Sequence, residues 1–391
     1  MALYRKHFIM RILIDSTQIP RGRTGVGIYA EHLIHELALI LRPEDNIFVL
    51  VQSDDQSMLG LIAGHANLTP VIINSSVFRN RLALAIHEQF AMPWILRRYR
   101  IDLIHSLHYT FPLLSSCSRV VTLHDMTFFL WPDMHTRGRQ LIMSFFAKLA
   151  LRHAEGVLFV SDSTRKDAEK LFGPGNNIRR VTPLGVDQAL FSSTGSTDAR
   201  ESLSKLGINQ PYILFLGTVE PRKNVLRLVQ AFESVSDRHP NHILVIAGGL
   251  GWNFEETLQA IEHSSVKKRI LRLGYVLPED KISLLSCCDL LAYPSLYEGF
   301  GLPVLEAMAA GVPVITSNVS SLPEIAGDAA VQINPLSVEL MAAAISWILE
   351  DNTYRNKLRQ AGKEQAKKFS WRTTARHTYA AYRQVMGDPL G

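Results

Sequence analysis

Residues 295–313 read Ser295-Leu-Tyr-Glu298-Gly-Phe-Gly-Leu-Pro303-Val-Leu-Glu306-Ala-Met-Ala-Ala-Gly311-Val-Pro313. An apolar run before this stretch predicts a strand, a turn with two glycines follows it, and Pro303 suits the first turn of a helix. Gly311 ends the helix after about two turns. A helix that begins at the carboxyl end of a parallel strand offers N–H groups to a phosphate, and Gly299 and Gly301 let a ligand approach the backbone. The stretch therefore predicts an anion site at the edge of a parallel sheet.

Short apolar runs alternate with helix-length segments on both sides of this stretch. The second half of the chain predicts strands at 212–217, 242–247, 270–274, 290–294 and 314–316, and the first half predicts strands at 11–15, 47–52, 70–73, 102–105, 120–124 and 156–161. The runs at 212–216 and 243–247 are almost wholly apolar, which is typical of strands buried on both faces. The sequence predicts an α/β fold with two Rossmann-like parallel-sheet domains that face each other across a cleft.

The length of 391 residues fits two domains. Residues 191–198 are small and polar, as in a linker, so we expect domains at 1–194 and 195–370. A further helix is predicted at 371–386, with Ala375, Tyr379 and Tyr382 on one face.

Composition excludes several classes of protein. Hydrophobic residues make up 47% and charged residues 20%, which argues against disordered, collagen-like and coiled-coil proteins. Three cysteines are too few for a disulfide framework, no apolar run is long enough to span a bilayer, and residues 1–11 do not resemble a secretory signal. We therefore expect a cytoplasmic protein.

The net charge of +5 comes from the first half of the chain. Arg97, Arg98 and Arg100 stand close in sequence to Phe90 and Trp94. These residues form either a solvated helix end or a basic and aromatic patch that contacts anionic lipid or a phosphorylated acceptor. Contact with anionic lipid would place the protein peripherally on the inner face of the cell membrane. Nucleic acid is not an expected partner, because no zinc-finger spacing or RNA-binding signature accompanies the patch.

Two adjacent cations follow the first strand of the second half, in Gly217-Thr-Val-Glu220-Pro-Arg222-Lys223-Asn224. Arg222 offers a planar fork and Lys223 a point charge, which together can bind a diphosphate leaving group. The alternative is that Arg222 and Lys223 are ordinary basic surface residues. Cations at the start of a helix are unfavourable beside the positive end of the helix dipole unless an anion accompanies them, which favours the diphosphate.

Two carboxylates flank the glycine turn. Glu298 lies on the loop, where it can contact a sugar, and Glu306 lies one helical turn further on, where it can accept hydrogen bonds from a ribose diol. The alternative is that Glu298 caps the turn and Glu306 is a solvated helix residue.

The first half carries weaker signals. Gly25 and Gly27 match a dinucleotide fingerprint, but residues 16–24 separate them from the preceding strand, which disfavours nicotinamide chemistry. The loop can still bind a phosphate or sugar, with Arg21 and Arg23 nearby. His124 ends a strand, so we expect it to contact substrate from the cleft rather than to be a structural histidine. His105 and His108 are weaker candidates, Asp125 is expected to orient its loop, and no residue spacing indicates a metal site.

Together these stretches resemble the retaining nucleotide-sugar glycosyltransferases of glycosyltransferase family 4, which have the two-domain GT-B fold. The pair Glu298 and Glu306 matches the family's glutamates within the frame E-G-F-G-L-P-x-x-E-A-M-A-x-G-x-P-V. The segment 220–224, Gly25-x-Gly27, His124-Asp125 and the segment 183–187 also lie where the family places its motifs.

The resemblance implies a role for each candidate. His124, Glu298, Arg222 and Lys223 would be catalytic, with Arg222 and Lys223 on the donor diphosphate and Glu298 near the anomeric carbon. Donor binding would involve Glu306 on the ribose and Gly25, Gly27, Gly217, Thr218, Gly299, Phe300, Gly301 and Leu302. The domain 1–194 would bind the acceptor, joined by a C-terminal helix at about 371–391, and the domain 195–370 would bind the donor.

One departure from the family pattern bears on the donor. Many relatives have an arginine directly after the glycine equivalent to Gly217, whereas this chain has Thr218. The version G-T-x-E-P-R-K-N resembles bacterial mannosyltransferases of surface-polysaccharide assembly, which implies GDP-mannose as donor and a saccharide or polyprenyl-linked saccharide as acceptor. The acceptor pocket is expected on loops 74–84 and 127–139. No metal or other cofactor is implied, and the alternatives are a sugar-nucleotide epimerase, a phosphorylase-like enzyme or a non-catalytic nucleotide-sugar-binding subunit.

Overall fold

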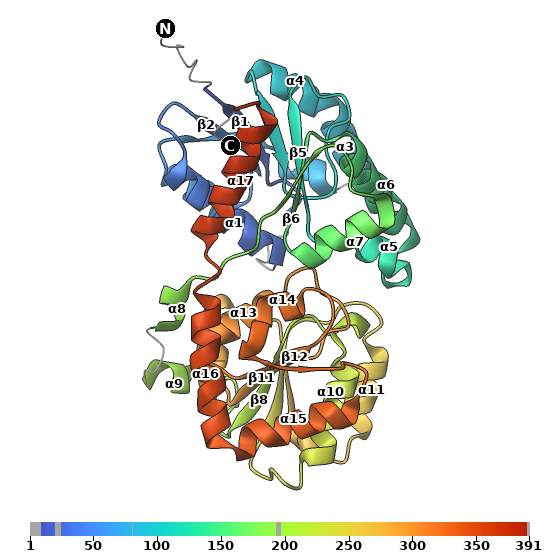
Figure 1. Cartoon of the computed structure of the whole chain (residues 1–391), viewed down its shortest axis with the longest axis vertical. Helices are drawn as coiled ribbons and strands as arrows, with labels where there is room; N and C mark the ends of the chain where they lie inside the picture. Colours follow the sequence, from blue (N-terminus) through green and yellow to red (C-terminus); the bar gives the residue numbers. More distant parts are fainter. Residues whose placement is uncertain (1–8, 20–24, 80, 193–196, 389–391) are drawn as a thin grey trace. The chain divides into compact units, whose positions relative to one another are not determined.

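A computed structural model of the chain describes residues 9–19, 25–79, 81–192 and 197–388 (Figure 1). The chain divides into two compact units: unit 1 comprises Met1–Gly185 and Trp371–Gly391, and unit 2 comprises Val186–Ser370. The boundary between the units therefore precedes the polar stretch 191–198, of which residues 193–196 lie outside the described residues. Arg21 and Arg23 also lie outside them.

Unit 1 is built on a parallel sheet of seven strands in the order β3-β2-β1-β4-β5-β6-β7. The strands are β1 (Arg11–Asp15), β2 (Asn46–Gln52), β3 (Leu68–Ile73), β4 (Leu103–Ser106), β5 (Ser118–Leu123), β6 (Gly156–Phe159) and β7 (Ile178–Val181). Their apolar side chains are buried on both faces in the centre of the sheet, as in β4 and β6. The chain order reverses between β1 and β4, which makes this pair the topological switch point of the sheet.

Helices cover both faces of this sheet. They are α1 (Gly25–Ile40), α2 (Gln56–Ala63), α3 (Arg81–Ile86), α4 (Met92–Arg98), α5 (Thr127–Leu130), α6 (Arg137–His153), α7 (Asp162–Phe172) and α17 (Trp371–Val385), with a π-helix, η2 (His87–Ala91), and short turns η1 (Ser75–Arg79) and η3 (Pro132–Met134). One apolar cluster joins β5, β6 and α6, and a second joins β1, β2 and α4. Among the described residues, no helix is both long enough and apolar enough to cross a bilayer.

The C-terminal helix α17 belongs to unit 1 and runs beside α1 (Figure 1). Its first residue, Trp371, stacks on His32 of α1 with ring centroids 4.7 Å apart. Tyr382 is fully buried, and its hydroxyl lies 2.5 Å from Nδ1 of His105 in β4. Ala375 is also fully buried, whereas Tyr379 is half-buried and its hydroxyl donates to Asp45. The apolar face predicted from sequence is thus the face that packs on unit 1.

Unit 2 is built on a parallel sheet of six strands in the order β10-β9-β8-β11-β12-β13. The strands are β8 (Tyr212–Leu216), β9 (Ile243–Ala247), β10 (Ile270–Gly274), β11 (Leu290–Tyr293), β12 (Val314–Ser317) and β13 (Val331–Ile333). The helices are α8 (Gln188–Ser192), α9 (Thr197–Lys205), α10 (Val225–Val235), α11 (Glu255–His263), α12 (Pro278–Cys287), α13 (Leu302–Ala309), α14 (Leu322–Ala326), α15 (Val338–Glu350) and α16 (Asn352–Ala366), with turns η4 (Pro221–Lys223), η5 (Lys267–Arg269) and η6 (Gly327–Ala329). The switch point of this sheet lies between β8 and β11.

The α/β class and the two parallel sheets agree with the sequence prediction. The predicted strands are present within two residues at each end, but two strands were not predicted, β7 and β13. Both lie at the edge of a sheet, and both are short and only partly buried. Because an edge strand buries less side-chain surface, its sequence lacks the continuous apolar run by which the central strands were found.

Candidate active site

The predicted cations and the predicted carboxylate meet at the switch point of unit 2. Arg222 and Lys223 lie in η4, which follows β8, and Glu298 lies in the loop that follows β11, the strand next to β8. Asn224 ties the two loops together, since its Nδ2 donates to the carbonyl oxygens of Pro294 and Pro335, at 3.0 and 2.6 Å. Parallel strands end at the same edge of a sheet, so residues distant in sequence converge there.

Glu298 forms ion pairs with both cations. Lys223 Nζ lies 2.6 Å from Glu298 Oε1, and an Arg222 Nη lies 2.9 Å from Glu298 Oε2. Lys223 also donates to the hydroxyl of Tyr293 at 2.6 Å, and that hydroxyl donates to Glu298 Oε1 at 3.0 Å. The second Nη of Arg222 pairs with Glu220 at 2.7 Å. Two cations therefore share one buried carboxylate at the carboxyl edge of the sheet.

The charged groups of this cluster shift one another's pKa values. Burial opposes ionisation of Glu298, but Arg222 and Lys223 outweigh it and lower the pKa of Glu298 to about 2. Burial lowers the pKa of Lys223, and Glu298 opposes that change. Burial and the charge of Glu298 raise the pKa of Tyr293 well above its ordinary value. At neutral pH Glu298 is a carboxylate, so it can stabilise positive charge, accept hydrogen bonds or act as a nucleophile, but it cannot donate a proton.

Two serines hold the loop from Glu298 to Gly301 in place through hydrogen bonds to its backbone. Ser321 Oγ donates to the carbonyl oxygens of Glu298 and Phe300, at 3.0 and 2.7 Å, and Ser320 Oγ accepts from the backbone N–H of Glu298. Gly301 has a φ of 114° and precedes α13, and a Cβ there would lie 2.8 Å from Leu322 Cδ2. The methyl end of Leu322 could shift to make room, but a φ of 114° is strained for any residue with a Cβ, so the conformation requires glycine. The predicted short helix is confirmed, and its N-terminus lies beside Glu298.

Glu306 lies in α13 and is buried, where it pairs with Lys281 of α12 at 2.6 Å. The solvated-helix alternative for this residue is therefore wrong. The ammonium of Lys281 orients the carboxylate and leaves its second oxygen to accept further hydrogen bonds.

In unit 1, the start of α1 and His124 lie close together. Helix α1 begins at Gly25, and Tyr29 in its second turn meets the ring of His124 edge to face, with centroids 5.2 Å apart. His124 Nε2 lies 2.9 Å from the carbonyl oxygen of Leu107, so Nε2 is the protonated nitrogen. Burial lowers the pKa of His124, and the ring is neutral at pH 7. Asp125 accepts hydrogen bonds from the N–H and hydroxyl of Thr127, and so holds the start of α5.

The structure thus groups the candidates into two sets, one in each unit. Unit 2 holds Gly217, Thr218, Arg222, Lys223, Glu298, Gly299, Phe300, Gly301, Leu302 and Glu306, and unit 1 holds Gly25, Gly27 and His124. Sequence reasoning missed the residues that orient the charged groups: Tyr293, Lys281, Ser320 and Ser321. Tyr293 could have been found, because it lies one residue before the end of the strand predicted at 290–294 and is the last residue of β11, but the pairing of Lys281 with Glu306 depends on the packing of α12 against α13.

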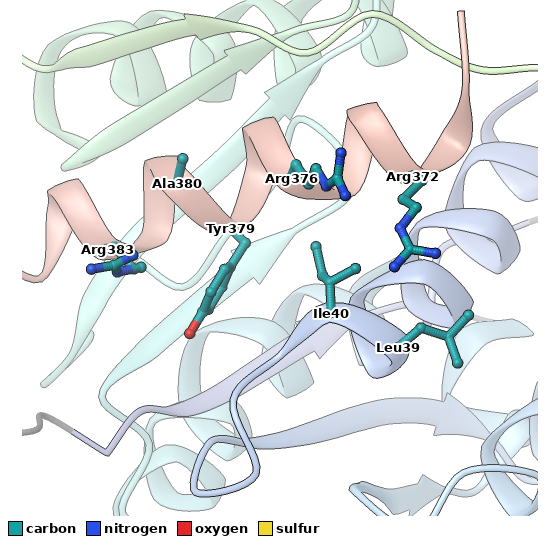
Figure 2. A pocket seen from close by; sticks show the side chains of 7 residues that line it. All are labelled: Leu39, Ile40, Arg372, Arg376, Tyr379, Ala380 and Arg383. Carbon is teal, nitrogen blue, oxygen red and sulfur yellow. The ribbon is translucent and has the colours of Figure 1, made fainter. Parts of the chain in front are cut away.

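A groove of about 420 Å³ lies elsewhere in unit 1, between α1 and α17 (Figure 2). It is lined by Leu39, Ile40, Arg372, Arg376, Tyr379, Ala380 and Arg383. Arg383 is neutralised by Asp388 at 2.8 Å. None of the predicted site residues lines this groove.

Within the part of the chain that the structure describes, no three His, Cys, Asp or Glu side chains could together hold a metal ion.

Comparison with known proteins identifies the family. Residues 198–365 match the family model Glycosyl transferases group 1, and residues 23–190 match Glycosyltransferase Family 4. The O-antigen chain mannosyltransferase B of Escherichia coli is 30% identical over 384 residues, which cover 96% of this chain and 100% of that protein. The chain belongs to glycosyltransferase family 4.

Solved structures show the fold of this family 4 chain. A sucrose-phosphate synthase from Thermosynechococcus elongatus has a TM-score of 0.77 at 20% identity and covers 97% of this chain and 99% of its own. Anabaena Alr3699/HepE, in complex with UDP and glucose, has a TM-score of 0.75 at 19% identity and covers 96% and 100%. The family 4 chain has the GT-B fold, and it is a glycosyltransferase.

Proposed function

We propose that this glycosyltransferase moves mannose from GDP-mannose to a saccharide or polyprenyl-linked saccharide during the assembly of a surface polysaccharide, with retention of the anomeric configuration. The observation that carries the proposal is the cluster of Arg222, Lys223 and Glu298 beside the N-terminus of α13. The choice of mannose is supported by the 30% identity to the E. coli O-antigen chain mannosyltransferase B over that protein's full length.

The donor diphosphate is assigned to the cations. Arg222 and Lys223 lie at the edge of the sheet, and both form an ion pair with Glu298. The N-terminus of α13 adds the positive end of a helix dipole. As the bond between sugar and diphosphate breaks, charge develops on the diphosphate, and preorganised cations in a buried site stabilise that charge strongly. Backbone contacts come from Gly299, Phe300, Gly301 and Leu302, with Gly217 and Thr218 at the end of β8.

The sugar and ribose are assigned to the two glutamates. Glu298 carries a negative charge at neutral pH and would stabilise the positive charge that forms at the anomeric carbon. Glu306, held by Lys281, would accept hydrogen bonds from the ribose hydroxyls through its second oxygen. His124, Gly25 and Gly27 of unit 1 are also assigned to the donor, since His124 is neutral and able to bind a sugar hydroxyl.

The proposed transfer is a displacement on one face of the sugar. The bond from the anomeric carbon to the diphosphate breaks, the acceptor oxygen bonds to the same face, and an oxygen of the leaving diphosphate accepts the acceptor's proton. Positioning and charge stabilisation supply most of the rate. We assign acceptor binding to residues 1–194 with the C-terminal helix, and donor binding to residues 195–370. No metal or cofactor takes part in this scheme.

Proton NMR of GDP-mannose with the protein and octyl α-mannoside tests the reaction. We expect release of GDP and a new α-linked mannosyl signal before any β signal. A β-linked first product would contradict retention. Consumption of UDP-glucose but not of GDP-mannose would contradict GDP-mannose as the donor. Conversion of the sugar without release of GDP would favour the epimerase alternative.

We also propose that the protein works at the inner face of the cell membrane, docked through one face of unit 1. Phe90 and Trp94 are 72% and 61% exposed, and the exposed Leu141 and Phe145 lie on α6. The loop 111–114 connects these elements, because the Gln89 side chain bonds to backbone atoms of Phe111 and Leu113, and Phe111 contacts Phe146 of α6.

Charge selects the partner for this face. Helices α4 and α6 contain no acidic residue, and they contribute arginines and a lysine around the apolar side chains. Arg98 lies over the ring of Trp94, 5.4 Å from its centroid. Aromatic residues with surrounding basic side chains bind the interface of an anionic bilayer.

Flotation with vesicles of phosphatidylglycerol and phosphatidylethanolamine tests this docking. The wild-type protein should float, less so as salt is raised, and a Phe90→Ser/Trp94→Ser variant should stay at the bottom. Trp347→Ser, which removes an exposed tryptophan from unit 2, is the matched control and should float like the wild type. Equal flotation of all three proteins, or of none, contradicts the proposal.

A further inference from the structure

A second cluster of buried polar side chains lies at the switch point of unit 1. Asp15 ends β1, Ser106 ends the neighbouring β4, and the two residues are paired in register. Side chains of paired residues in neighbouring strands point to the same face of a sheet. Ligands of parallel sheets bind outside the carboxyl ends of the strands at the switch point, which is where unit 2 holds its charged cluster.

Other elements bring polar groups to the same place. Glu88 comes from the π-helix η2, a rare form of helix that is often found at functional sites. Its carboxyl hydrogen-bonds Thr110, and its pKa responds to the charge of Asp15. Gln18 also donates to Thr110, at 2.5 Å. The cluster of Asp15, Gln18, Glu88, Ser106 and Thr110 therefore combines two carboxyls, one amide and two hydroxyls.

Two oxygen atoms of this cluster have no hydrogen-bond partner among the residues that the structure describes. They are Oε1 of Glu88 and Oγ of Ser106, on residues that are 5% and 1% exposed. A buried polar atom without a partner costs about 1–3 kcal/mol, so such atoms usually have a ligand or a task. On the opposite side of β4, His105 is equally buried, but its two ring nitrogens lie within hydrogen-bond distance of Tyr382 and Thr122. Of these two neighbouring residues of β4, Ser106 is therefore the one whose side chain has an atom without a described partner.

The chemistry of the cluster favours a neutral ligand rich in hydroxyl groups. Burial raises the pKa of Glu88 to about 8, so at pH 7 this carboxyl is mostly protonated and can both donate and accept. Burial also raises the pKa of Asp15, although hydrogen bonds from Thr17 oppose the change. The cluster contains no lysine or arginine, and the neighbouring His87 is neutral at pH 7 because burial lowers its pKa. Nothing in the cluster would attract a phosphate.

We propose that Asp15, Glu88, Ser106 and Thr110 bind hydroxyl groups of the acceptor saccharide. The inference rests on the proposed function, because it assigns the unmet hydrogen bonds to the second substrate of the transfer. It differs from the prediction made from sequence, which expected the acceptor pocket on loops 74–84 and 127–139. Glu88 accepts from one sugar hydroxyl and donates to another, and Ser106 adds a further hydrogen bond.

Saturation-transfer NMR with methyl α-mannoside, methyl α-glucoside and methyl α-galactoside tests the site without any donor. We expect the wild-type protein to bind at least one of these glycosides, Glu88→Leu to bind it at least tenfold more weakly, and Glu88→Gln to stay within about threefold, because an amide also donates and accepts. Ser144→Ala, which changes a buried serine of α6, is the matched control and should bind normally.

GDP binding, followed by thermal shift, separates this proposal from the proposed function. The Glu88 and Ser106 variants should bind GDP as the wild type does, since GDP is assigned to unit 2. A protein that binds GDP but none of the three glycosides, or a folded Glu88→Leu variant with unchanged glycoside affinity, overturns the acceptor site alone. If circular dichroism shows that Glu88→Leu is unfolded, Ser106→Ala takes its place as the test. This variant should fold, because it removes a hydroxyl without a described partner, and it should bind the glycoside about fivefold more weakly. Unchanged glycoside binding by Ser106→Ala overturns the proposal.

Discussion

At the scale of single residues, the arrangement of Glu298 with Arg222 and Lys223 is better suited to binding than to stability. Burying an ion pair costs desolvation that the attraction repays only in part, whereas removing one partner leaves a buried charge without compensation. Here one carboxylate balances two cations, and Glu220 balances part of the charge of Arg222. In the proposed function, the donor diphosphate would pair with these cations when it binds.

Glu298 also makes the stability of the protein depend on pH. The folded state lowers its pKa from 4.5 to about 2, so its contribution is complete above pH 4.5 and is lost as the pH falls towards 2. A pKa difference of this size corresponds to about 3 kcal/mol. In urea unfolding, Glu298→Gln should be less stable than wild type at pH 7 and should lose less stability between pH 4.5 and 2.5.

The exposed Glu262 provides the control for this prediction, because Glu262→Gln changes a glutamate in the same unit whose partner Lys267 is also exposed. That variant should follow the wild-type pH dependence. Parallel pH profiles for Glu298→Gln and wild type would show that the buried cluster does not set the acid sensitivity.

Sequence reasoning predicted the residues of this cluster but not their full set of partners. Arg222, Lys223 and Glu298 were found because each follows a strand, and strands of one parallel sheet end at a common edge. Lys281 and Tyr293 were not found as partners, because their contacts depend on how α12 packs on α13 and on the turn after β11. Local patterns carry no information on such distances.

At the scale of elements, α13 is the element that its sequence determined most completely. Pro303 lies in its first turn, and Gly311, with a φ of 71°, follows its end. The two edge strands were missed, since their short and half-polar sequences resemble loops. The helix α17 was predicted from its apolar period, but its partners on α1 and β4 were not.

Gly301→Ala tests whether the start of α13 forms part of the donor site. The new methyl group meets the end of the Leu322 side chain, and alanine is strained at a φ of 114°, so we expect the loop from Glu298 to shift. The KM for the donor should rise at least tenfold. Gly249→Ala is the control, because a Cβ there has no atom within 4 Å, and it should leave the KM unchanged. Equal KM values for both variants would remove α13 from the donor site.

Tyr382→Phe tests how α17 is held on unit 1. The hydroxyl of Tyr382 is the partner of Nδ1 of the fully buried His105, and without it that nitrogen loses its hydrogen bond. Unfolding in urea should show a loss of about 1–3 kcal/mol. Tyr354→Phe, on a half-buried tyrosine of unit 2, should cost less. A loss for Tyr382→Phe no larger than for this control would mean that packing alone holds α17.

At the scale of the whole molecule, the chain repeats one arrangement in two units. Each unit has a parallel sheet, each sheet reverses its order once, and each switch point carries buried polar side chains. The cluster in unit 2 contains cations and carboxylates and is assigned to a nucleoside diphosphate in the proposed function, whereas the cluster in unit 1 lacks lysine and arginine and is proposed to bind a sugar. The fold and the charged cluster were predictable, because both follow from strand order, but the cluster in unit 1 was not, since Glu88 and Thr110 belong to no motif.

The central claim is that the cluster in unit 2 binds the diphosphate of GDP-mannose, and a thermal-shift panel with GDP, UDP and ADP tests it most directly. A ligand at one hundred times its Kd stabilises the native state by about 2.7 kcal/mol. We expect GDP to raise the Tm of the wild-type protein and of Lys267→Ala, which changes an exposed lysine of unit 2, but not that of Lys223→Ala. No response of the wild type to any of the three nucleotides, or an undiminished response of Lys223→Ala, would contradict the claim.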